Sequence, residues 1–152
     1  MSALAKQCMK DGEVILLKDF SNAFNASNRN LLIKLAASFL PEIAPLAYWL
    51  YADETELFVS NGEVLNSSEG VHQGCGLANL LFALLMQYVV TRIPSDGVSC
   101  KGSYWDDAFT KSTPTAALKV LQSLRKLEAK TNLKLNLQKV HLYAPNEKVA
   151  QE

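Results

Sequence analysis

The sequence predicts an α+β domain in which an antiparallel sheet carries helices packed on one face. Three observations support this class. Short apolar runs with strand character alternate with longer helical segments, without an internal repeat or a low-complexity linker. Residues 56–65 have the pattern of a β-hairpin, which implies antiparallel pairing. The longest apolar run, residues 77–90, has the length of a buried helix rather than of a strand.

The chain is predicted to begin with a strand and two helices. The apolar run Val14–Leu17 reads as a buried strand that ends at Asp19. A turn-rich segment follows, and then a helix around Leu31–Phe39. Pro41 suits the first turn of a second helix, which extends through Tyr51.

The middle of the chain combines the hairpin with the buried helix. Asn61-Gly62 is the pair that a mirror-image turn prefers, because both central residues of that turn need positive φ. A loop with three glycines leads into the helix that begins at Leu77. That helix is shorter than the ~20 residues needed to cross a bilayer, and Asn79 and Gln87 interrupt its apolar character. We therefore expect no membrane span.

The last third is predicted to hold strands around one more helix. Residues 98–105 are a candidate strand that leads into two adjacent aspartates. Thr113 and Pro114 look like the N-cap and the first residue of a helix. Leucines repeat every three residues along this helix and predict its core face: Leu118, Leu121, Leu124 and Leu127. Residues 133–138 and 140–145 close the chain with strand-like alternation.

Length and charge limit the classes of function. A chain of 152 residues fits one domain with a substantial core. Fifteen basic residues balance fifteen acidic ones, which argues mildly against an autonomous nucleic-acid binder but leaves room for a local basic groove. The cysteines are three in number, Cys8, Cys75 and Cys100. An odd count without a Cys-x-x-Cys pair favours a reducing compartment. With no signal-peptide-like start, an intracellular location, cytoplasmic or nuclear, is expected.

Three aspartates are the candidate chemical groups. Asp19 closes one predicted strand, and Asp106 and Asp107 lie at the turn between two others. If those strands are neighbours, the three carboxylates converge at one edge, where Mg²⁺ would find the oxygen ligands it prefers. Two such metals about 4 Å apart can clamp both oxygens of a phosphoryl transfer. Alternatively, Asp107 merely favours a turn and Asp19 merely ends a strand.

Four ordered segments resemble the motifs of reverse transcriptases, most similar to those of retroelements lacking long terminal repeats. LLKDFSNAFN (16–25) resembles the first motif, and SSEGVHQGCGLANLLFALLMQ (67–87) resembles the second, usually written with QGDPLGPLLF. YWDD (104–107) matches the Tyr-x-Asp-Asp signature of the third, and NLKLNLQKVHLY (132–143) resembles the fourth. Together these motifs cover nearly the whole chain.

The resemblance implies a polymerase palm with ferredoxin-like architecture and the activity of an RNA-directed DNA polymerase. Such an enzyme adds deoxynucleotides to a primer 3′-hydroxyl, so an RNA template, a DNA primer and deoxynucleotides would be its partners. Asp19, Asp106 and Asp107 match the catalytic metal ligands of the family. The implied cofactors are two Mg²⁺ ions, for which Mn²⁺ can substitute.

The resemblance also assigns roles outside the aspartates. Phe24 matches the residue that excludes a ribose 2′-hydroxyl, although an ordinary core phenylalanine is an equal alternative. Gln73 and Gly74 match a loop that touches template and incoming nucleotide, against the alternative of a plain connection. Tyr104 would pack or line the site beside the aspartates. Lys139 fits a catalytic position near the leaving pyrophosphate, with a solvated surface lysine as the alternative.

The sequence departs from the family pattern in three respects. The family's Asp-Pro-Leu-Gly-Pro is replaced over Cys75–Asn79, which removes two prolines and an acid before the long helix. Lys18 stands where an apolar residue is usual, and it fits a buried central strand poorly. Residues 1–152 read as a single palm-like domain with fingers and thumb largely absent, so catalysis would require those segments or another chain. The isolated chain is expected to extend a primer poorly or not at all.

Two further hypotheses remain open. A catalytically inactive, retroelement-derived remnant would fold in the same way and act, if at all, as a protein- or RNA-binding module. A primase or RNA-polymerase-like palm would share the acidic geometry, but Phe24 and the Gln73-Gly74 loop speak against it.

Overall fold

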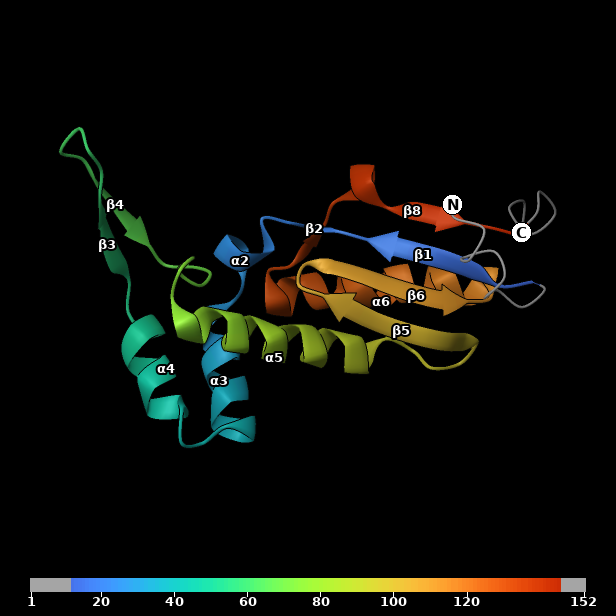
Figure 1. Ribbon diagram of the computed structural model, residues 1–152, viewed down its shortest axis with the longest axis horizontal. Coiled ribbons are helices and arrows are strands. Elements are labelled where there is room, and N and C mark those ends of the chain that lie inside the picture. Colours follow the sequence, from blue (N-terminus) through green and yellow to red (C-terminus); the bar gives the residue numbers. More distant parts are fainter. Residues whose placement is uncertain (1–11, 146–152) are drawn as a thin grey trace.

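The computed structural model describes residues 12–145, which include a four-stranded antiparallel sheet (Figure 1). Its strand order is β5 (Val98–Tyr104), β6 (Asp107–Ser112), β1 (Val14–Lys18) and β8 (His141–Tyr143). Strand β1 is central, since it pairs antiparallel with β6 on one side and with β8 on the other. The strand predicted after residue 13 is thereby confirmed.

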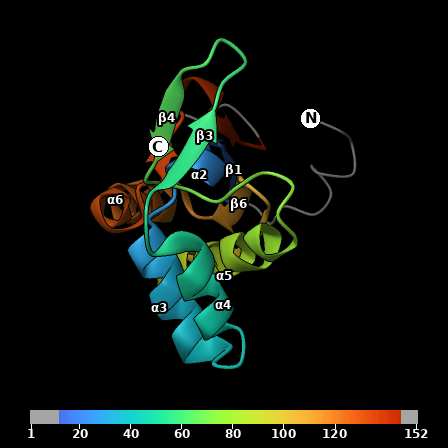
Figure 2. The ribbon, with the colours of Figure 1, turned by 90° about the vertical axis from the view of Figure 1, so that its left-hand side faces the viewer.

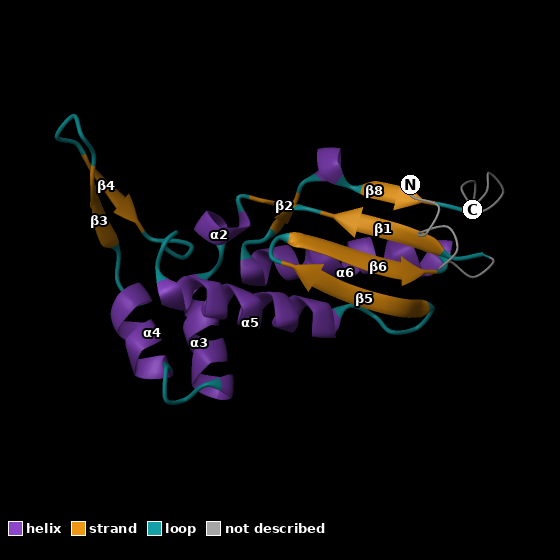
Figure 3. Cartoon of the chain, in the orientation of Figure 1, coloured by secondary structure: helices purple, strands orange, loops and turns teal. Residues whose placement is uncertain are grey.

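Helices α5 (Gly76–Arg92) and α6 (Pro114–Thr131) cover one face of this sheet, as Figure 3 shows for α6 behind the strands. Alternation along the two central strands directs one set of side chains toward the helices, and these are buried: Val14, Leu16, Lys18, Ala108, Thr110 and Ser112. The opposite face carries exposed side chains such as Leu17 and Phe109. The predicted α+β class, with helices on one face, is confirmed.

Apolar packing between helices completes the core. Helix α5 supplies a run of buried side chains that includes Leu81, Phe82 and Leu85, which explains why it is apolar around most of its circumference. Helix α3 (Arg29–Phe39) packs against α5, and α4 (Ala44–Tyr51) packs against α3 (Figure 2). No helix among residues 12–145 is long and apolar enough to cross a membrane.

Four short elements link these layers. Helix α2 (Ala23–Ala26) follows the two-residue strand β2 (Phe20–Ser21), which pairs with β7 (Lys134–Leu135) in a small sheet of its own. A 3₁₀ turn, η1 (Leu137–Lys139), leads from β7 to β8 (His141–Tyr143). Residues 133–138, expected to be a single strand, are therefore split because β7 pairs with β2 while the chain must turn to bring β8 beside β1.

The hairpin of β3 (Thr55–Phe58) and β4 (Val64–Ser67) confirms the predicted pairing but not the predicted turn. The turn bond joins the Gly62 amide to the Val59 carbonyl, and Gly62 has φ 87° while Asn61 does not have positive φ. The loop is therefore longer than two residues, and one glycine supplies the left-handed residue that it needs. The Asn61 side chain instead accepts a hydrogen bond from the Glu63 amide.

Two helix predictions also need correction. Helix α4 begins at Ala44 with Pro45 in its first turn, so Pro41 precedes the helix rather than starting it. In α6, Leu118 is exposed, whereas Val120 and Leu124 are buried. A spacing of three residues rotates around a helix that repeats every 3.6 residues, so leucines three apart drift off one face. The predicted cap is confirmed, because the Thr113 side chain accepts a hydrogen bond from the Ala116 amide.

Candidate functional site

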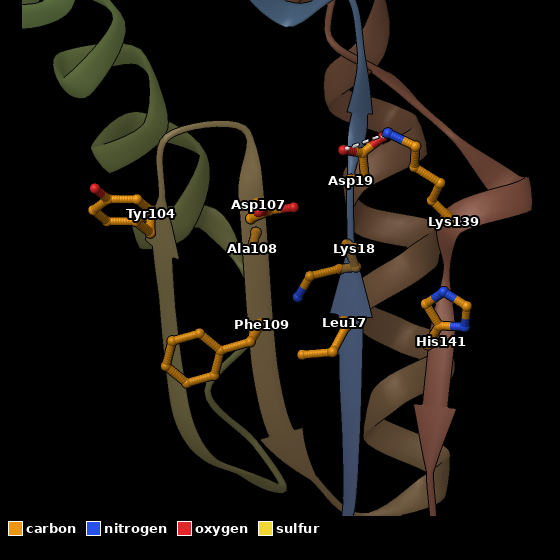
Figure 4. Close-up of a pocket in the computed structure, with 9 residues that line it drawn as sticks. All are labelled: Leu17, Lys18, Asp19, Tyr104, Asp107, Ala108, Phe109, Lys139 and His141. Carbon is orange, nitrogen blue, oxygen red and sulfur yellow. Dashed lines mark hydrogen bonds and ion pairs between the residues drawn. The ribbon is translucent and has the colours of Figure 1, made fainter. Parts of the chain in front are cut away.

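The strand register brings Asp19 and Asp107 to facing positions. The last pair between β1 and β6 joins Lys18 to Ala108. Continued by one residue, this register brings Asp19 opposite Asp107. Alternation then directs both away from the helices, onto the open face that carries Leu17. Figure 4 shows the Asp107 side chain directed toward the strand that leads to Asp19. The expectation that the two acidic segments lie on adjacent antiparallel strands is confirmed.

A short turn joins β5 to β6 and contains Asp106. Tyr104 pairs with Asp107, so Trp105 and Asp106 form the two-residue connection. Trp105 has φ 55°, a left-handed conformation that is uncommon for a bulky residue. Such strain costs of order 1–3 kcal/mol and persists only where the surroundings enforce it.

A pocket of about 480 Å³ lies on the Asp106 side of this turn. It gathers residues from four separate segments of the chain: Phe24, Gln73, Gly74, Asn79, Tyr104, Trp105, Asp106 and Asp107. Six of these are residues that the sequence singled out. Asn79 and Trp105 were not, although a tryptophan within the aspartate turn is a signal that could have been used.

Phe24 stands between the core and this pocket. Its ring stacks on Phe82 of α5, with centroids 4.2 Å apart, and lies 5.6 Å from the Trp105 ring. Both interpretations of Phe24 are therefore compatible with its position, since one side packs on the core and the other lines the pocket.

A second pocket, of about 540 Å³, lies on the Asp19 side (Figure 4). Its lining includes Asp19, Asp107, Tyr104 and Lys139. Tyr104 borders both pockets and is largely exposed, so it lines the site rather than packing in the core. Asp107 also borders both pockets, and it is the first residue of β6, the strand that pairs with β1.

The Asp19 carboxylate already has two partners. The Lys139 ammonium lies 3.3 Å from its Oδ2 atom, and the Asn136 side-chain amide donates to the same oxygen at 3.2 Å. The Asn136 backbone amide also donates to the Asp19 carbonyl. These contacts fix the segment 136–139 over the end of β1, at the position where the sequence places its fourth motif.

The donor set suits a hard divalent cation, but the carboxylates are not gathered around one point. Asp19 and Asp107 share the open face, and Asp106 lies across the turn in the neighbouring pocket. Within residues 12–145, no three acidic, histidine or cysteine side chains are grouped closely enough to hold a metal ion. The oxygen chemistry therefore fits Mg²⁺, whereas binding of a metal by all three aspartates stays a prediction.

Arg29 anchors the loop that carries Gln73 and Gly74. This buried guanidinium donates to the Gly70 carbonyl at 2.8 Å and to the Ser67 carbonyl at 2.7 Å, and it also contacts His72 Nε2 at 3.4 Å. Burial lowers the pKa of His72, and the positive charge of Arg29 lowers it further. One feature of the sequence could have identified Arg29. It is a basic residue in the first turn of a helix, where its charge opposes the helix dipole.

Gly70 fastens the same loop to α2. Its amide donates to the Ser27 carbonyl, and the Val71 amide donates to the Phe24 carbonyl. Gly70 has φ 69°, and a Cβ atom there would lie 2.3 Å from the Asn25 backbone. Only glycine allows this approach, which couples the Gln73-Gly74 loop to the helix that bears Phe24.

Cys75 replaces the family's acid at the start of α5. It is the N-cap residue of this helix. A hydrogen bond from the Tyr51 hydroxyl lowers the pKa of Cys75; burial opposes this effect, and the amides of Leu77 and Ala78 assist it. Burial, together with the Cys75 contact, raises the pKa of Tyr51 to about 12. Cys75 and Cys100 are free thiols, and Cys8 lies outside the described residues.

The comparison with protein families gives one match over nearly the whole chain. The model of the family described as reverse transcriptase (RNA-dependent DNA polymerase) matches residues 3–150. No curated protein sequence matches the chain.

Solved structures resemble the fold despite low identity. Telomerase from Candida albicans in complex with a TWJ fragment of telomeric RNA has a TM-score of 0.73 and 12% identity, over 96% of this chain and 29% of that one. Apo telomerase from Candida tropicalis, truncated from the C-terminal domain, has a TM-score of 0.72 and 14% identity, over 92% of this chain and 32% of that one.

A third similar structure is the RNA-dependent RNA polymerase of a human picobirnavirus, with a TM-score of 0.58 and 17% identity over 91% of this chain and 28% of that one. The chain thus spans about a third or less of the length of these proteins. At such identities the likeness shows the fold alone, which is that of a polymerase palm.

Proposed function

Because the chain belongs to the reverse transcriptase (RNA-dependent DNA polymerase) family, we propose that it is the palm of an RNA-directed DNA polymerase. The observation that carries this proposal is the facing placement of Asp19 and Asp107 on the open side of the sheet, with Asp106 in the adjoining pocket. The proposed domain is a single palm over residues 1–152, which works with fingers and thumb segments or with another chain. The motif pattern favours a retroelement without long terminal repeats as its source.

The proposed substrates are a deoxynucleotide, a DNA primer and an RNA template. Phe24 forms the pocket wall that would exclude a ribose 2′-hydroxyl, since its ring is held in place by Phe82 and cannot retreat into the core. Gln73 and Gly74 would contact the template and the incoming nucleotide from a loop that Arg29 fixes. The free thiols of the described cysteines support an intracellular setting.

Asp19, Asp106 and Asp107 are the residues proposed to hold two Mg²⁺ ions. Bound there, the ions would stabilise charge on the phosphate oxygens during nucleotidyl transfer. Lys139 is proposed to act beside the leaving pyrophosphate. Its ammonium is paired with Asp19, so this role requires the ion pair to open, at a modest cost because Lys139 is largely exposed.

An inactive module remains the second candidate, and two observations favour it. Lys139 neutralises Asp19, and the carboxylates of the described region form no group that could hold a metal. Such a chain would keep the fold while lacking cation binding, which gives the two candidates different outcomes in a cation titration.

Nucleotide binding tests the proposed function through Trp105, which lies in the pocket. With Trp49 replaced by Phe, Trp105 is the only tryptophan left in the chain. Thymidine triphosphate with Mg²⁺ is expected to quench its fluorescence saturably, and the ribose counterpart is expected to bind roughly tenfold more weakly. Phe24→Ala should remove most of that discrimination.

Phe39→Ala provides the control, because Phe39 is exposed on α3 and outside the pocket. That variant should discriminate between the two sugars as the parent does. Equal binding of both nucleotides by the parent, or no fluorescence response to either, would count against the proposed function.

A further inference from the structure

The neutral net charge of the chain conceals a strong separation of charge. Residues 35–91 contain six acidic residues and no lysine or arginine. The rest of the chain therefore carries all fifteen basic residues and only nine acidic ones. This acidic part runs from the end of α3 to the last residue of α5 before Arg92, and all six of its acidic residues lie within residues 42–69, around α4 and the β3–β4 hairpin. The hairpin lies at the opposite end of the molecule from the four-stranded sheet (Figure 1).

The hairpin also exposes apolar side chains on both of its faces. The register places Leu57 opposite Leu65 on one face and Phe58 opposite Val64 on the other. All four are exposed, and Phe58 is 80% exposed. In the part of the chain that the structure describes, β3 and β4 form a sheet of only two strands, so each keeps one unpaired edge.

Such a hairpin is an incomplete structure. Two strands alone are at best marginally stable in water, and a third strand would pair an open edge and cover apolar area. Three acidic residues belong to or directly precede the strands: Glu54, Glu56 and Glu63. This charge repels nucleic-acid phosphates, so the hairpin does not suit a template or a primer.

We propose that the β3–β4 hairpin is a docking surface for an extended protein segment in which basic and apolar side chains alternate. The segment adds as a strand to the hairpin; its apolar side chains cover Leu57–Leu65 or Phe58–Val64, and its basic side chains pair with the glutamates. Charge complementarity selects a basic partner over a second acidic hairpin. The proposal is independent of the metal site and of polymerase activity.

The test uses an eight-residue peptide of alternating lysine and valine, with the glutamate–valine peptide and a single-stranded RNA oligonucleotide as comparisons. The lysine peptide is expected to bind the intact chain, to weaken with added salt, and to shift backbone amide NMR signals of residues 54–67. The double variant Glu54→Lys/Glu56→Lys should lose about tenfold or more in affinity, as expected when attractive charge pairs become repulsive.

Asp96→Lys is a control charge reversal at one site, since Asp96 is exposed and lies outside the acidic part. It should leave peptide affinity unchanged, and melting temperatures of all variants verify that they fold. Phe58→Ser is a second test variant. It leaves the charge of the hairpin unchanged and should still weaken peptide binding. Equal binding of the glutamate peptide, RNA binding at the hairpin signals, or unchanged affinity in the Glu54/Glu56 double variant would each overturn the proposal.

Discussion

Lys18→Met is expected to raise the free energy of unfolding by about 2 to 4 kcal/mol at pH 7. Lys18 is 1% exposed in the central strand, and its ammonium donates to Thr110 Oγ1 at 3.3 Å. Among residues 12–145 it takes part in no ion pair. Burial lowers the pKa of Lys18 from 10.5 to about 7. Methionine fills similar space without a charge, and the loss of the Thr110 contact offsets part of the gain.

The pH dependence follows from that shift. Between pH 7 and 10.5 the unfolded chain keeps the lysine proton that the folded chain releases. The destabilisation caused by burying Lys18 is therefore complete below pH 7 and disappears above pH 10.5. Urea denaturation in EDTA should show the largest difference between wild type and Lys18→Met near pH 6 to 7, shrinking toward pH 10. Lys34→Met, at an exposed position of α3, should show no such difference. If the stability difference between wild type and Lys18→Met were absent, or did not change with pH, the result would contradict this account.

Arg29→Met is expected to destabilise the fold by roughly 3 kcal/mol or more. The guanidinium donates hydrogen bonds to three backbone carbonyls, those of Asp53, Ser67 and Gly70, and to the Ser67 hydroxyl. It also lies 5.6 Å from the centre of the Tyr51 ring. Methionine would leave the buried Gly70 carbonyl and the partly buried Ser67 acceptors without this donor, and lysine cannot replace a planar fork with several donors.

Urea denaturation of Arg29→Met, Arg29→Lys and the exposed control Arg125→Met measures this effect. Both Arg29 variants should lose stability, and amide exchange in residues 67–74 should accelerate more than in the four-stranded sheet. If both variants kept wild-type stability, the loop would be held by the Gly70 contacts to α2 alone.

Local sequence signals predicted the elements whose formation depends on local chemistry. The strand before Asp19, the buried helix after Cys75 and the Thr113 cap were all accessible, because apolar runs and capping residues act within a few positions. The Leu118 prediction failed because a spacing of three was treated as one helical face. The Asn61 prediction failed because turn length depends on strand register, which a dipeptide does not determine.

The sequence predicted the site residues that belong to its motifs, but not the contacts between them. Order along the chain indicated that Asp19 and Asp107 would meet, and the register between β1 and β6 brings them opposite each other. The pairing of Asp19 with Lys139 and Asn136 depends on how η1 folds back over β1, across more than a hundred residues. Long-range contacts of this kind leave no periodic signal in a single sequence.

The most direct test of the central claim is whether Asp19, Asp106 and Asp107 bind divalent cations. Thermal melts with and without millimolar Mn²⁺ or Mg²⁺ should be measured for wild type, Asp106→Asn and Asp53→Asn. Asp53 is a suitable control because it is exposed, lies away from both pockets, and serves Arg29 through its backbone carbonyl, which the substitution keeps.

A cation that binds only the folded chain stabilises it by about 1.4 kcal/mol at ten times its dissociation constant, which corresponds to a rise of a few degrees in Tm. We expect that rise in wild type and in Asp53→Asn, with Mn²⁺ acting more strongly than Mg²⁺, and its near loss in Asp106→Asn. If wild type and Asp106→Asn respond alike, the three aspartates do not form a metal site, and the inactive module becomes the better description of this chain.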